Sequence, residues 1–240
     1  MKIIANWKMN LPTPNLGSWT ESFYQNVSLQ DNKFIGIAPP FTHISDCIKH
    51  FKDIRIGAQN ISSETEGNRT GEISAHIAKD SGASFVILGH SEVRENFNEN
   101  ALLINRKIKL AIKNYLSPVV CFGEPKDIYK SGDTEDFICS QLKECFKDIQ
   151  ADNIVIAYEP IWSIGTGTLP KINEISEIHS SIKDYCINHL KFKPESILYG
   201  GSVNDENCSN LINDKYIDGF LVGGASLKGN SFAKIVNNCI

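Results

Sequence analysis

Eight short apolar runs recur along this 240-residue chain, roughly 20 to 40 residues apart, and they constrain its fold more than any other feature. Each run is rich in β-branched or aromatic residues, is too short for a helix, and is apolar at both odd and even positions. This pattern is typical of parallel strands that are buried on both faces. The runs begin at Lys2, Lys33, Ile54, Ser84, Ser117, Asn153, Ser196 and Ile217.

Helical patterns lie between these runs. The segments 100–116, 134–149 and 173–187 place apolar residues three or four positions apart, which predicts a helix with one buried stripe. Eight strands that alternate with helices favour a closed (β/α)8 barrel over an open doubly wound sheet. An open sheet would usually have fewer strands and a GxGxxG turn after the first one. Because no linker interrupts the pattern, we expect a single domain over residues 1–240.

Charge and composition exclude several classes of function. The net charge is -4 and no long basic run occurs, so we expect no nucleic-acid partner. No segment approaches the ~18 apolar residues of a membrane span, and the N-terminus does not resemble a signal peptide. The seven cysteines are odd in number and lack metal-ligand spacing. We therefore expect a cytoplasmic protein with reduced thiols and no metal.

Chemically active side chains follow several of the predicted strands. In a barrel the loops after the carboxyl ends of the strands meet on one face, so these residues should converge there. Asn6 and Lys8 follow the first strand, His90 the fourth and Glu159 the sixth. Asn6 and Lys8 are two positions apart, so on a continuing strand both would point into the barrel mouth.

The convergent side chains suit proton transfer at carbon. Glu159 can act as a base, and Lys8 can stabilise an oxyanion as it develops. His90 can move protons between two oxygens. Ser91 is a plausible N-cap, which would place the His90 ring at a helix start, where positive potential favours neutral imidazole.

Glycine-rich turns follow the sixth, seventh and eighth strands. Such turns let backbone N–H groups approach an anion closely, and a helix start behind a turn adds a favourable dipole. The sequence therefore predicts a phosphate cradle at this end of the barrel. Its candidate members are Gly165, Ser202, Gly223 and Gly224.

Six motifs in this order resemble those of the triosephosphate isomerase family, along essentially the whole chain. They are "NWKMN", "GHSEVR", "CFGEP", "YEPIWSIGTGT", "YGGSV" and "VGGASL". The resemblance implies a TIM barrel that interconverts glycerone phosphate and D-glyceraldehyde 3-phosphate, in glycolysis and gluconeogenesis, without a metal or organic cofactor. It implies that Glu159 is the base, His90 the electrophile and Lys8 the stabilising cation, with Asn6 helping to hold the site.

The resemblance also implies a lid and a partner. Residues 160–168 would close over the substrate, with Ile161, Trp162 and Ile164 excluding water. The polar segment 62–71 should protrude after the third strand, and in this family the loop carrying Thr70 implies a homodimer. Thr168, Val93 and the pair Asn68-Arg69 depart from the usual family pattern.

For three further residues near the site, the sequence predicts supporting or structural roles. We expect Glu92 to support the site from behind, Glu124 to form a structural ion pair, and Cys121 to pack in the core.

Two other functions remain open at this point. A different phosphate-binding barrel enzyme, such as another phosphosugar isomerase or a lyase, would need another acid or base in place of Glu159 and His90. A phosphate sensor or adhesive surface protein could keep the barrel and lose catalysis, although the intact set of Asn6, Lys8, His90 and Glu159 argues against it.

Overall fold

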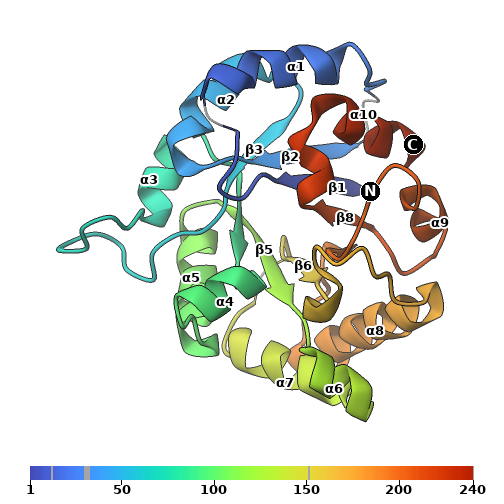
Figure 1. Cartoon of the computed structure of the whole chain (residues 1–240). Helices are drawn as coiled ribbons and strands as arrows, with labels where there is room; N and C mark the ends of the chain where they lie inside the picture. The colour runs from blue at the N-terminus through green and yellow to red at the C-terminus, as the bar shows by residue number, and fades with distance from the viewer. Residues whose placement is uncertain (12, 30–32, 151, 240) are drawn as a thin grey trace.

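Eight parallel strands close into a barrel in the sequential order β1 to β8, and helices surround it (Figure 1). The computed structural model describes residues 1–11, 13–29, 33–150 and 152–239. The strands are β1 (Lys2–Asn6), β2 (Phe34–Ala38), β3 (Arg55–Ala58), β4 (Phe85–Leu88), β5 (Ser117–Phe122), β6 (Val155–Tyr158), β7 (Ser196–Tyr199) and β8 (Gly219–Val222). The expected (β/α)8 TIM barrel is therefore confirmed.

The helices follow the strands in alternation. They are α1 (Leu16–Tyr24), α2 (Ile44–His50), α3 (Ala75–Asp80), α4 (Ser91–Asn96), α5 (Ala101–Lys113), α6 (Lys126–Ser131), α7 (Thr134–Cys145), α8 (Ile172–Tyr185), α9 (Cys208–Ile212) and α10 (Gly229–Asn238). The three periodic segments of the sequence correspond to α5, α7 and α8. Their buried residues, such as Ile104 and Ile108 of α5, confirm the predicted stripes.

Alternation along each strand divides the core into two layers. One set of strand residues fills the barrel interior, and the other set packs outward against the helices. In β4, Phe85 and Ile87 point into the barrel, whereas Val86 and Leu88 join the outer layer. The strands are buried on both faces, as their apolar runs predicted.

The barrel departs from the sequence prediction at the end of β1. The strand stops at Asn6, and Lys8 has a left-handed backbone with φ of 52°. The prediction that Asn6 and Lys8 share one strand face is therefore wrong, because the chain turns between them. The predicted loop at 62–71 does protrude, between β3 and α3 (Figure 1).

The structure also bears on membrane insertion and on disulfide bonding. Within the described ranges, no helix is both long enough and apolar enough to cross a bilayer. All seven cysteines are free thiols.

Candidate active site

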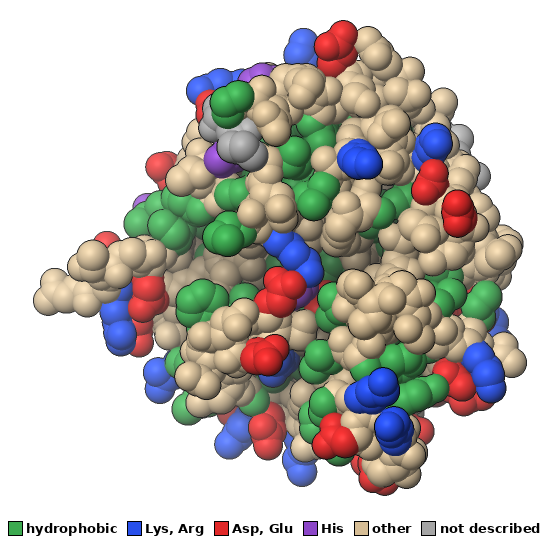
Figure 2. All heavy atoms as spheres, in the orientation of Figure 1, with side chains coloured by type: hydrophobic (Ala, Val, Ile, Leu, Met, Phe, Trp, Pro, Cys, Tyr) green, Lys and Arg blue, Asp and Glu red, His purple; other side chains and the backbone are tan. Residues whose placement is uncertain are grey.

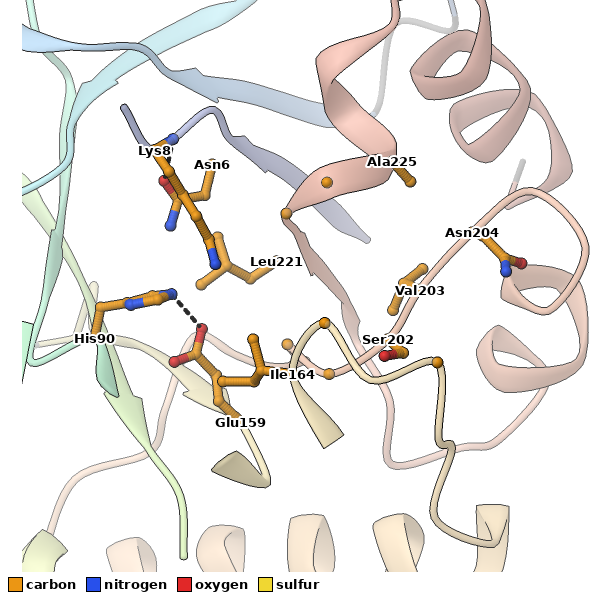
Figure 3. A pocket seen from close by; sticks show the side chains of 16 residues that line it. Asn6, Lys8, His90, Glu159, Ile164, Ser202, Val203, Asn204, Leu221 and Ala225 are labelled. Atoms are coloured by element: carbon orange, nitrogen blue, oxygen red, sulfur yellow. Dashed lines mark hydrogen bonds and ion pairs between the residues drawn. The ribbon is translucent and has the colours of Figure 1, made fainter. Parts of the chain in front are cut away.

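A pocket of ≈ 300 Å³ opens at the carboxyl ends of the strands, and all eight candidate residues from the sequence line it. Glu159, His90 and Lys8 lie together on one side, opposite the turns after β7 and β8 (Figure 3). Figure 2 shows the same face hollowed near its centre, where basic and acidic side chains adjoin. The lining residues are Asn6, Lys8, His90, Glu159, Ile164, Gly165, Gly167, Gly200, Gly201, Ser202, Val203, Asn204, Leu221, Gly223, Gly224 and Ala225.

The Glu159 carboxylate is almost fully withdrawn from solvent, with 2% of the residue exposed. Its Oε1 lies 3.5 Å from Nε2 of His90, while its Oε2 has no hydrogen-bond partner in the described structure. Burial raises the pKa of this carboxyl group, and the nearby His90 and Lys8 only partly oppose the effect. A carboxylate in this environment is a stronger base than one in water, and its free oxygen is available to a substrate C–H group.

Two glycines make room for Glu159. A Cβ at Gly123 would lie 1.7 Å from the Glu159 carbonyl oxygen, and one at Gly200 would lie 2.6 Å from Glu159 Cγ. A side chain at Gly200 would displace the carboxylate, and one at Gly123 would displace the backbone that carries it. The sequence motif pointed to Gly200 only as part of a phosphate turn, and it did not single out Gly123.

His90 caps α4 with its own ring. Its Nδ1 accepts a hydrogen bond from the backbone N–H of Glu92 at 3.3 Å, which leaves the ring proton on Nε2, facing Glu159. Ser91 is the first residue of the helix, so the prediction that Ser91 is the N-cap is wrong. The error is one position, and the His90 ring still lies at the start of a helix, as expected.

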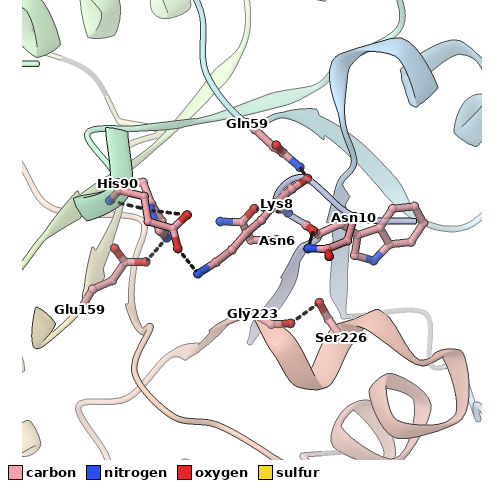
Figure 4. A network of polar contacts seen from close by, with 10 residues as sticks. Asn6, Lys8, Asn10, Gln59, His90, Glu159, Gly223 and Ser226 are labelled. Carbon is pink, nitrogen blue, oxygen red and sulfur yellow. Dashed lines mark hydrogen bonds and ion pairs between the residues drawn. The ribbon is translucent and has the colours of Figure 1, made fainter. Parts of the chain in front are cut away.

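Lys8 is fixed at both its backbone and its ammonium group (Figure 4). Its backbone N–H donates to Oδ1 of Asn6 at 3.1 Å, and its carbonyl accepts from Nε2 of Gln59 at 2.8 Å. Its Nζ lies 2.6 Å from Oε1 of Glu92, so Glu92 does support the site from behind. Gln59 was not among the residues predicted from the sequence, although it lies directly after β3.

The turns at the far side of the pocket are held by side chains. The Ser202 hydroxyl donates to the carbonyl of Ser163 at 2.7 Å, which joins the turn after β7 to the loop after β6. The Ser226 hydroxyl donates to the carbonyl of Gly223 at 2.7 Å and fixes the turn after β8. Backbone turns fixed in this way suit the binding of an anion such as phosphate.

The 160–168 loop covers the pocket only in part. Ile164, Gly165 and Gly167 line the pocket, and the two glycines have left-handed backbones with φ of 69° and 73°. Trp162 points elsewhere, because its Nε1 donates to Oε1 of Glu124 at 2.8 Å. Ile161 lines a small cavity beside Arg94 instead. Of the three expected covering side chains, only Ile164 faces the pocket in this conformation.

The surroundings of Glu124 and Cys121 test the roles that the sequence predicted for them, an ion pair for Glu124 and core packing for Cys121. Among the described residues Glu124 forms no ion pair, so that expectation is wrong; its Oε1 accepts from Trp162 and from the hydroxyl of Tyr158 at 3.3 Å. Cys121 faces the barrel interior, as expected for a packing residue. Burial raises the pKa of its thiol well above the usual range, which disfavours the nucleophilic thiolate.

Comparison with known proteins matches the whole barrel. The family model described as triosephosphate isomerase matches residues 1–239. The chain is 38% identical to the triosephosphate isomerase of Mycoplasmopsis pulmonis over 242 residues, covering 98% of this chain and 96% of the relative. It is 40% identical to that of Trichodesmium erythraeum over 238 residues, covering 98% and 97%. It is also 40% identical to that of Dictyoglomus thermophilum over 244 residues, covering 98% of each chain.

Proposed function

The chain belongs to the triosephosphate isomerase family, and from that membership we propose which of its residues perform each step of the reaction. It is an isomerase that interconverts glycerone phosphate and D-glyceraldehyde 3-phosphate through an enediolate, a step of glycolysis and gluconeogenesis. The two alternatives left open by the sequence, another barrel enzyme and a sensor without catalysis, lose their support. The observation that carries the assignment of roles is the convergence of Lys8, His90 and Glu159 on one pocket.

Glu159 is the base of the proposed mechanism. Its unpartnered oxygen removes a proton from the substrate carbon next to the carbonyl group and later returns it to the neighbouring carbon. Burial supports this role in two ways, since it raises the pKa of the carboxyl group and keeps water from competing for the proton.

His90 and Lys8 act on the substrate oxygens. As the enediolate forms, negative charge moves to the former carbonyl oxygen, where the Nε2–H of a neutral His90 donates a hydrogen bond and then its proton. His90 then takes the proton of the neighbouring hydroxyl group, whose oxygen becomes the new carbonyl, and so regains its own proton. The Lys8 ammonium group stabilises the same charge, and Asn6 holds Lys8 through its backbone. Glu92, which pairs with Lys8, balances the cation before the substrate arrives.

The substrate phosphate would lie against the opposite side of the pocket. Backbone N–H groups at Gly165, Ser202, Gly223 and Gly224 are the proposed donors, which requires no metal or organic cofactor. Gly165 belongs to the 160–168 loop, so phosphate binding would draw that loop closed. Closure matters because an enediolate phosphate left in water eliminates its phosphate group.

We also propose that residues 1–240 form one catalytic domain, which works as a cytoplasmic homodimer. The protruding 62–71 loop carries Thr70, and Met9 and Phe97 are 95% and 75% exposed. A hollow of ≈ 580 Å³ lies between this loop and the start of α5, with Phe97 on its wall. A second copy would bury these apolar side chains, and light scattering on the purified protein should give twice the chain mass of 26.7 kDa.

A coupled assay with each triose phosphate tests the proposed roles. Glu159→Gln and His90→Gln should each lower kcat by about 10²–10⁴-fold, the usual contribution of a general acid or base. Glu206→Gln, a change of an exposed carboxylate on the loop before α9, serves as the matched control and should keep full activity. Full turnover by Glu159→Gln, or none by the unaltered protein, would refute the assignment.

A further inference from the structure

One side chain outside the 160–168 loop, that of Tyr129, contacts Trp162 near the start of the loop and Glu174 in α8, beyond its end. Tyr129 is a half-buried residue of α6, the helix that follows β5 and lies next to α8 (Figure 1). Tyr129 does not line the proton-transfer pocket, and the mechanism above does not use it.

At the first end, the Tyr129 ring stacks on Trp162. The ring centroids are 4.2 Å apart and the planes are inclined by 29°. The indole Nε1–H of Trp162 donates a hydrogen bond to buried Glu124. Trp162 is thus held on a face and at an edge, in the short turn Ile161–Ser163 that immediately follows Glu159 and Pro160.

Beyond the second end of the loop, the Tyr129 hydroxyl donates to Oε2 of Glu174, a residue of α8, at 3.1 Å. The same carboxylate accepts from the backbone N–H of Lys171 at 3.3 Å, and its Oε1 lies 3.8 Å from Lys171 Nζ. These contacts lie at Lys171 and at the start of α8, on the segment that follows the loop.

The residues between the two held ends have the features of a moving part. Residues 165–168 are exposed, and both glycines there have left-handed backbones. Fixed ends confine the motion to this short stretch, so fewer backbone torsions must be ordered when the loop closes.

We propose that Tyr129 is a positioning residue that clamps both hinges of the 160–168 loop and thereby sets how readily the loop closes over the substrate. This inference rests on the proposed function, because it assigns the loop a closing role in that reaction. The stack fixes the first hinge, and the hydroxyl fixes the second.

Two substitutions separate the two contacts. Tyr129→Phe removes the hydroxyl and keeps the stack, whereas Tyr129→Leu removes both. We expect KM to rise by about 2- to 3-fold in the first variant and kcat/KM to fall by about 10-fold in the second, the range expected for losing one aromatic stack and one hydrogen bond. The pH profile of kcat/KM should not move in either, since Tyr129 does not contact Glu159.

Fluorine NMR of 5-fluorotryptophan at Trp162, assigned with a Trp162→Phe variant, reports on the first hinge directly. The unaltered protein should give one sharp Trp162 signal that shifts when 2-phosphoglycolate, a carboxylate analogue of the enediolate, is added. Tyr129→Leu should broaden or split this signal in the free protein. The matched control is Tyr185→Leu, which breaks a similar stack on His189, with centroids 4.8 Å apart, away from the loop.

Tyr129→Leu protein that is folded and matches the unaltered protein in both the fluorine spectrum and kcat/KM would overturn the clamp. The spectrum of the free protein needs no turnover. An inactive unaltered protein would therefore refute the proposed function, while the spectrum still decides for or against the clamp.

Discussion

Glu159 is buried as deeply as the apolar core, although its carboxylate must be charged to act as the base that we propose. One of its oxygens makes no hydrogen bond to a nitrogen or oxygen atom in the described structure, and burial raises the pKa of the group. An ionised group held in this way costs stability, because water would solvate it in the unfolded chain. Function at this residue therefore opposes stability.

The opposition at Glu159 can be measured with one substitution. Glu159→Gln removes the charge and keeps the shape, so we expect the free energy of unfolding at pH 7 to increase by about 1 kcal/mol, or about 2–4 °C in Tm for a chain of this size. Calorimetry of the variant and the unaltered protein checks this. An unchanged or lower Tm would mean that the buried carboxylate is compensated after all.

The lack of a side chain at Gly123 leaves room for the backbone of Glu159. Gly123→Ala would bring a methyl group onto the Glu159 carbonyl oxygen, since the ideal Cβ lies 1.7 Å from it. We expect this variant to lose about 1–3 kcal/mol of stability through overpacking, and at least tenfold in kcat because the base is displaced.

Gly17→Ala is the matched control for this change. Gly17 lies in α1, where an added Cβ meets nothing within 4 Å, so the variant should gain about 0.4–1 kcal/mol and keep its activity. If Gly123→Ala were as active as Gly17→Ala, the close approach would have no catalytic consequence.

At the scale of the elements, a hydrogen bond of Ser163 joins two parts of the 160–168 loop. The Ser163 hydroxyl donates to the carbonyl of Thr168 at 2.6 Å, which joins the two ends of the left-handed stretch. Ser163→Ala should leave that carbonyl unpaired and widen the range of loop conformations, so we expect KM to rise by about 5-fold with little change in Tm.

Steady-state kinetics with either triose phosphate measure the effect of Ser163→Ala. Ser131→Ala is a suitable control, because that hydroxyl makes a similar local bond to the carbonyl of Ile128, at 3.0 Å, on an exposed helix end. Equal KM values in the two variants would argue against a role of the Ser163 bond in lid closure.

The sequence predicted elements well where periodicity decides them and poorly where single backbone angles do. All eight strands and the three periodic helices were found because burial on two faces and on one stripe leaves distinct patterns. The turn at Lys8 was missed because a lysine with φ of 52° leaves no such pattern. His90 was placed correctly, but its capping by the ring depends on a side-chain torsion that sequence does not encode.

The directions of the side chains in the 160–168 loop could not be predicted from the sequence either. The family resemblance implied three covering residues, yet Trp162 turns toward Glu124 and Tyr129, which lie on segments distant in sequence. Gln59 and Gly123 were missed for the same reason, since their roles arise from contacts between strands rather than from any local motif.

At the scale of the whole molecule, closure of the barrel gathers the proposed reacting groups, which follow β1, β4 and β6, at one end. It leaves other titratable groups buried among the helices. His179 of α8 is one of these. Its ring is fully buried, with one nitrogen bonded to the carbonyl of Tyr216 at 3.0 Å and the other without a partner in the described structure. Burial lowers its pKa to about 4.

His179 makes the fold sensitive to acid. The native ring stays neutral down to a pH of about 4, whereas the unfolded ring takes up a proton below its ordinary value of 6.5. Its stabilising effect is therefore complete above pH 6.5 and is lost as the pH falls toward 4, by roughly 3 kcal/mol in total. Glu159 works in the opposite sense, because its raised pKa makes the native state bind the extra proton, so stability falls as the pH rises from 4.5 toward that raised value.

The two opposing effects predict a specific difference between variants. Urea denaturation at several values between pH 4 and pH 8 should show that His179→Gln loses much less stability on acidification than the unaltered protein, since an amide does not titrate. Glu159→Gln should lose more, because the carboxylate that gains from acid is gone. Parallel pH profiles for the three proteins would mean that neither buried group governs the acid response, and that exposed carboxylates at the surface of the barrel do so instead.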